Sequence, residues 1–116
     1  MKLTYCITFL LASLTFMAHG QSNLQKGITL YQSKKLEEAT KSFKGIEKTS
    51  ADYGAAQYYL GRIAYDKKEY DDAVDYFKIA TEKNSTNGEY FNWLGDAYSG
   101  VGSESNVFTQ MSVGPK

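Results

Sequence analysis

The sequence repeats itself at a spacing of 34 residues. Gly61 stands 34 positions after Gly27 and 34 positions before Gly95. Apolar residues recur in the same register: Leu36 with Tyr70, Ala39 with Ala73, Phe43 with Phe77, Ile46 with Ala80, and Leu60 with Leu94. A period of this length predicts stacked units of supersecondary structure, each of which buries its apolar face against its neighbours.

Each period contains two runs in which apolar residues recur every three or four positions, and this spacing predicts a pair of helices. The expected first helices span residues 23–32, 52–66 and 87–99, and the expected second helices span 36–48 and 69–83. Ser22 with Gln25, and Thr86 with Glu89, have the three-residue spacing of a capping box at a helix start.

The run from Leu60 to Ala80 reads Leu-Gly and then Tyr-x-x-Ala-x-x-x-Phe-x-x-Ala. This pattern resembles the tetratricopeptide repeat, whose period is also 34 residues. The resemblance implies an all-α fold, a solenoid of antiparallel helix pairs. The repeats would occupy residues 21–53 and 54–87, followed by a partial third repeat with an irregular C-terminal segment in 88–116.

The period weakens after the third expected first helix. Gly100 and Gly102 indicate a flexible connector over residues 100–103, with at most a short helix near 107–111. No second helix of the third repeat follows, so we interpret the chain as a fragment or a truncated protein. Stability in such arrays is close to a sum of repeat and interface terms, so two and a half repeats are expected to be marginal.

The first 20 residues are predicted to be a cleaved signal peptide. Met1-Lys2 is a positive start, residues 3–17 form an uncharged apolar run, and residues 18–20 are small or polar before Gln21. A retained membrane anchor is the alternative, although a run of about 15 residues is short for a bilayer span of about 20. We therefore expect export to the periplasm or out of the cell, with no membrane association after cleavage.

Composition narrows the function classes. Thirteen Lys and Arg balance thirteen Asp and Glu, so no basic surface for nucleic acid is expected. The single Cys and the single His are Cys6 and His19, and both lie in the predicted signal peptide. Without them the chain has no thiol or imidazole for nucleophilic catalysis or zinc binding, so we expect no enzyme activity, cofactor or metal.

The family resemblance implies a protein or peptide partner that binds the concave surface formed by the first helices. Tyr and Arg are enriched at binding hot spots, and this surface is expected to be rich in Tyr with one Arg. The predicted partner-binding residues are Tyr31, Tyr58, Arg62, Tyr65, Asp66, Asn92 and Asp96. The alternative is that the tyrosines pack between neighbouring helices and the acidic residues form a solvated surface.

Two other functions stay open from the sequence. The repeats could be the N-terminal region of a larger multidomain protein or enzyme. They could also be a self-assembly element that associates through the incomplete third repeat.

Overall fold

The computed structural model describes residues 22–113, with side chains placed for residues 22–105. It contains the helices α2 (Asn23–Gln32), α3 (Leu36–Lys44), α4 (Tyr53–Asp66), α5 (Tyr70–Lys83) and α6 (Gly88–Val113), and no strand occurs between residues 22 and 113. The predicted signal peptide, residues 1–20, lies outside the described residues.

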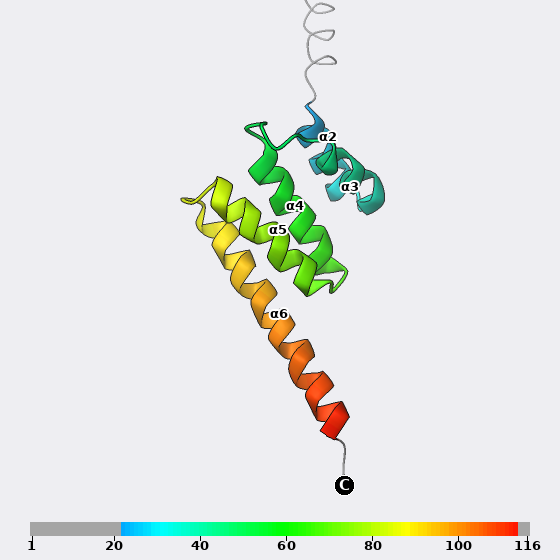
Figure 1. Ribbon diagram of the computed structural model, residues 1–116. Coiled ribbons are helices and arrows are strands. Elements are labelled where there is room, and N and C mark those ends of the chain that lie inside the picture. The colour runs from blue at the N-terminus through cyan, green and yellow to red at the C-terminus, as the bar shows by residue number, and fades with distance from the viewer. Residues whose placement is uncertain (1–21, 114–116) are drawn as a thin grey trace, which may run out of the picture.

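Each helix packs on the next one along the chain, and α2 and α6 also contact α4. The first helices α2, α4 and α6 therefore share one side of the molecule, whereas α3 and α5 lie between them on the other. Figure 1 shows α6 running alongside α5 and continuing past the end of the α4–α5 pair. The all-α helical repeat fold is confirmed.

A glycine marks the crossing point in both complete repeats. A Cβ atom added at Gly27 would lie 2.6 Å from the Phe43 ring, and one added at Gly61 would lie 2.6 Å from the Phe77 ring. Both phenylalanines are fully buried. The glycines are needed because only a residue without a side chain lets the ring reach the backbone of the first helix.

The turns inside the two repeats are equivalent. Lys34 and Lys68 have positive φ angles of 64° and 62°. The N–H of Lys35 donates to the carbonyl of Leu30 at 2.9 Å, and the N–H of Glu69 donates to that of Ala64 at 2.9 Å. This is the Schellman pattern, which closes a helix and reverses the chain within a few residues.

An aromatic triad joins each repeat to the next. Tyr59 of α4 stacks on Phe43 with 5.2 Å between ring centroids and meets Tyr31 edge-on at 5.6 Å. The residues 34 positions further on form the second triad, which consists of Tyr65, Phe77 and Trp93. The two inter-repeat contacts therefore use aromatic residues at equivalent positions, although Phe43 and Tyr59 are stacked whereas Phe77 and Trp93 are tilted by 33°.

The predicted connector at 100–103 is wrong, because α6 continues through it to Val113. A Cβ atom at Gly100 would lie 2.5 Å from the Tyr70 ring. Gly100 therefore allows a close contact between α6 and α5, and Val101 packs against the core cluster beside it. The irregular segment expected after residue 99 is helical as far as residue 113.

The helix starts agree in part with the sequence. Ser22 caps α2 as predicted, with its Oγ accepting from the N–H of Gln25 at 3.2 Å. At α6 the capping oxygen belongs to Asn87 instead of Thr86, and it accepts from the N–H groups of Glu89 at 3.1 Å and Tyr90 at 3.4 Å. Asn is a stronger helix cap than Thr, so residue type favoured Asn87, whereas the three-residue spacing to Glu89 had indicated Thr86.

Candidate functional site

Arg62 lies between the second and third repeats on the side of the first helices. Its guanidinium carbon is 3.9 Å from the centroid of the Trp93 ring on α6. Its Nη1 donates to the hydroxyl of Tyr58 at 2.7 Å. A cation over an indole face is attracted by the ring quadrupole, so Arg62 ties α4 to α6.

Tyrosine–carboxylate hydrogen bonds extend this contact across the repeats. The hydroxyl of Tyr58 on α4 donates to Glu89 Oε1 on α6 at 2.6 Å. The hydroxyl of Tyr31 on α2 donates to Asp66 Oδ2 on α4 at 3.2 Å. The side of α2, α4 and α6 that carries these residues, here called the A-helix face, therefore joins all three repeats.

Burial raises the pKa values of the tyrosines in this cluster. Desolvation and the hydrogen bond to Glu89 raise the pKa of Tyr58 to about 12, although Arg62 acts in the opposite direction. Desolvation also raises the pKa of Tyr31 and of Tyr90. Burial is the largest single effect on the pKa of Arg62 and acts to lower it, but the hydrogen bond with Tyr58 and the electrostatic attraction of Tyr31, Tyr58 and Asp66 together raise the pKa overall.

The raised pKa of Tyr58 predicts a loss of stability at alkaline pH. The folded pKa of about 12 lies above the ordinary value of 10.0. The protonated phenol is therefore favoured in the folded state, so its contribution is complete below pH 10 and is lost as the pH rises toward 12. Urea unfolding midpoints between pH 9 and 12 should fall less steeply for Tyr58→Phe than for the wild type.

Tyr98→Phe is the matched control for this pH series, because Tyr98 is 51% exposed and lies away from the cluster. It should follow the wild-type profile. A Tyr58→Phe profile that also overlays the wild type would contradict the assignment of the alkaline loss to Tyr58.

The predicted site residues divide into a buried or half-buried group and an exposed group. The first consists of Tyr31, Tyr58, Arg62 and Tyr65, and the second of Asp66, Asn92 and Asp96. Tyr58 is only 6% exposed and stacks on Tyr90 with 4.5 Å between centroids, so the packing alternative describes its ring. Arg62 is half-buried on Trp93. Tyr31 and Tyr65 are half-buried, and the exposed members are Asp66, Asn92 and Asp96. The three exposed polar residues are therefore the most accessible members of the predicted set.

Two residues of this cluster were outside the predicted set. They are Glu89, which accepts from Tyr58, and Trp93, which lies under Arg62. Trp93 stands 34 positions after Tyr59, which is an inter-repeat ring in the first triad. That register could have placed Trp93 at the next interface, although not beneath Arg62.

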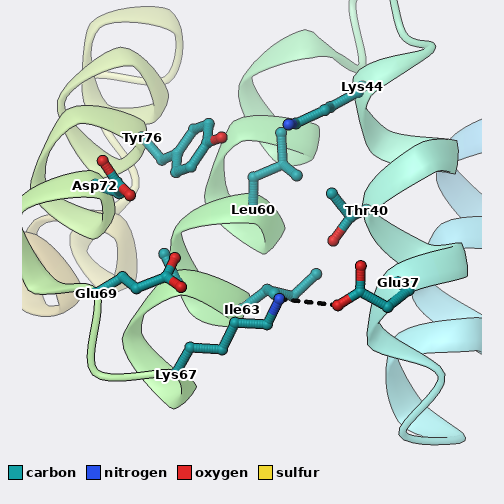
Figure 2. Close-up of a pocket in the computed structure, with 10 residues that line it drawn as sticks. Glu37, Thr40, Lys44, Leu60, Ile63, Lys67, Glu69, Asp72 and Tyr76 are labelled. Carbon is teal, nitrogen blue, oxygen red and sulfur yellow. Dashed lines mark hydrogen bonds and ion pairs between the residues drawn. The ribbon is translucent and has the colours of Figure 1, made fainter.

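A cleft of about 280 Å³ lies on another side of the molecule, between α3, α4 and α5. Figure 2 shows Leu60 and Ile63 at its base and charged side chains around its rim. Lys67 Nζ and Glu37 Oε1 are 3.1 Å apart across it. An exposed ion pair of this kind contributes little to stability. The volume of the cleft is slightly below that of usual ligand pockets, so the cleft is not the leading candidate site.

Comparison with known families decides the assignment. The family model of the tetratricopeptide repeat matches residues 24–88, which is more than half of the chain. The chain belongs to the tetratricopeptide repeat family. No curated protein and no solved structure matches it in the corresponding searches.

Tetratricopeptide repeats generally mediate protein–protein interactions, and members of the family are typically non-enzymatic scaffolds. Among residues 22–113, no helix has the combined length and apolar character needed to cross a bilayer. The same part of the chain contains no group of three or more His, Cys, Asp or Glu residues suited to a metal ion.

Proposed function

We propose that this tetratricopeptide protein is a non-enzymatic interaction module that binds a protein or peptide partner on its A-helix face. The observation that carries the proposal is the arrangement around Arg62, where side chains from all three repeats meet on one surface. Tyr31 and Tyr65 offer half-buried rings there, and rigid aromatic rings are favourable anchors at interfaces.

The buried members of the cluster support the surface from below. Arg62 and Tyr58 are held by Trp93, Glu89 and Tyr90, so they are fixed before a partner arrives. A preorganised surface loses less conformational entropy on binding. Tyr58 and Arg62 thus position the face, whereas the exposed polar residues Asp66, Asn92 and Asp96 contact the partner.

The test is a paired substitution of the exposed carboxylates on this face. Asp66→Asn with Asp96→Asn should weaken binding at least about tenfold, because rim and contact charges set electrostatic complementarity. The partner would be captured from an extract of the cell envelope, identified, and then titrated against each variant. Asp71→Asn with Asp75→Asn on the exposed side of α5 is the matched control and should leave the affinity unchanged.

If the Asp66→Asn, Asp96→Asn variant bound the partner with the affinity of the wild type, the assignment of binding to the A-helix face would be contradicted. An identified partner acting outside the cytoplasm would also support the proposed export to the periplasm or medium. N-terminal sequencing of the protein from cells tests the cleavage proposed after Gly20 directly.

Self-assembly through the third repeat is a second candidate, and one observation favours it. Phe91 and Tyr98 on α6 are 46% and 51% exposed, and exposed apolar groups of this size favour association. Light scattering that rises with protein concentration would support it. A role as the repeat region of a larger protein or enzyme is the remaining alternative.

A further inference from the structure

Helices α4 and α6 have equivalent faces, 34 positions apart in the sequence. On α4 this face is covered by a neighbouring helix. Gly54, Gln57, Gly61 and Ala64 of α4 are all buried. A Cβ atom at Gly54 would lie 2.9 Å from Lys83 Cβ, and one at Gly61 would lie 2.6 Å from the Phe77 ring. The covering element is therefore α5, which runs antiparallel to α4.

The corresponding residues of α6 have no cover among the described residues. Residues 34 positions further on are Gly88, Phe91, Gly95 and Tyr98, here called the α6 face, and all four are exposed. A Cβ atom at Gly88 or Gly95 would meet no atom within 4 Å. The two large hydrophobic residues that stand out as exposed, Phe91 and Tyr98, both belong to this face.

We propose that the α6 face is a docking site for an amphipathic helix of a partner protein, with a phenylalanine that seats on Gly95. The α6 face continues the interface that the two complete repeats already form. In each of them a Phe ring covers the glycine, with an alanine four residues earlier: Ala39 before Phe43, and Ala73 before Phe77.

The α6 face also restricts what the partner helix carries. Tyr98 stands where α4 has Ala64, and antiparallel packing brings that position opposite the alanine that precedes the Phe. A larger ring on α6 requires a small residue opposite it, because overpacked helix contacts are destabilising. The motif that fits is Ala or Gly, three residues, and then Phe.

This site differs from the A-helix face in position and in chemistry. The α6 face contains no charged residue, whereas the A-helix face presents Asp66 and Asp96. This inference therefore does not depend on binding at the A-helix face, and it is the alternative to self-assembly through the same two residues, Phe91 and Tyr98.

The test uses the full chain and a synthetic peptide of residues 69–83, which reproduces α5 and its Ala73–Phe77 spacing. Binding is followed by fluorescence anisotropy of a labelled peptide. We expect saturable binding, at least about tenfold weaker binding by the peptide with Phe77→Ala, and a similar loss when the protein carries Gly95→Leu. Isolated peptides of this length are marginal helices, so the affinity will be modest.

Gly95→Leu should fold normally, because the position is open and Leu is a better helix former than Gly. Circular dichroism confirms this before titration. Exchange of the peptide for the protein's own α5 would occur at Gly61 and would not respond to Gly95→Leu. Asn92→Ala, on the A-helix side of the same helix, is the matched control and should bind the peptide as the wild type does.

Three outcomes overturn the proposal. One is the absence of saturable binding, and another is equal binding by the Phe77→Ala peptide or by the Gly95→Leu protein. The third is a concentration-dependent dimer that Gly95→Leu abolishes and the peptide does not compete, which would assign the α6 face to a second copy of the chain.

Discussion

Replacing Phe77 by alanine is expected to lower the free energy of unfolding by about 3–5 kcal/mol. The ring is fully buried and lies against the backbone of Gly61. It also lies 6.1 Å from both the Tyr58 and the Trp93 ring centroids, so it contacts the next repeat as well as its own. Its loss leaves a cavity at the centre of the molecule.

Urea unfolding followed by far-UV circular dichroism measures this loss, and Phe91→Ala is the matched control. Phe91 is 46% exposed on α6, and substitutions at exposed positions usually change stability by less than about 0.5 kcal/mol. Similar losses at the two positions would show that the solenoid does not depend on the Phe77 contact. Domains of this kind have only about 5–15 kcal/mol in total, so Phe77→Ala should remove a large part of the free energy of unfolding.

Gly61→Leu is expected to destabilise the chain by about 3 kcal/mol or more, at the upper end of overpacking effects. The first added atom, Cβ, would already lie 2.6 Å from a fully buried ring. Phe77 has no free space into which to move, so α4 and α5 must separate. Leu is a better helix former than Gly, by close to 1 kcal/mol, so the destabilisation comes entirely from the contact.

The control for Gly61→Leu is Gly95→Leu, measured at low protein concentration. The two glycines occupy equivalent positions, but a Cβ atom at Gly95 meets nothing within 4 Å. Gly95→Leu should therefore unfold at the same or a higher urea concentration than the wild type. If Gly61→Leu were instead as stable as the wild type, the α4–α5 crossing would have adapted to the added side chain.

The repeat architecture was predictable because its signals are local and repeated. Gly27 with Phe43, and Gly61 with Phe77, have the same separation along the chain, and the structure brings both pairs into contact. Packing within a helix pair depends on residues less than one period apart, so periodicity in the sequence carries it. The family match over residues 24–88 agrees with this.

The path of α6 was not predictable from the same signals. Gly100 and Gly102 are the residues that usually end a helix, and they were interpreted as a connector. Gly100 instead faces the Tyr70 ring, 30 positions earlier in the chain. The sequence does not distinguish a glycine that provides flexibility from one that allows two helices to approach closely. Only the position of the neighbouring helix distinguishes them.

The candidate site was predictable as a surface but not as a set of contacts. The positions of Tyr31, Arg62 and Asp66 followed from the family resemblance. The stacking of Arg62 on Trp93 depends on how α4 and α6 lie across the repeat boundary, which periodicity does not specify. The signal peptide and the compartment stay predictions, since residues 1–20 lie outside the described part of the chain.

The length of α6 gives the molecule a defined reach. Gly100 of α6 lies against the Tyr70 ring of α5, and the helix continues to Val113. At 1.5 Å per residue, the stretch of helix from Gly100 to Val113 is roughly 20 Å long. A Gly/Ser-rich tether of equal length would point in no fixed direction. A group joined at the end of α6 would instead be held at a set distance and bearing from the repeats, as by a spacer arm.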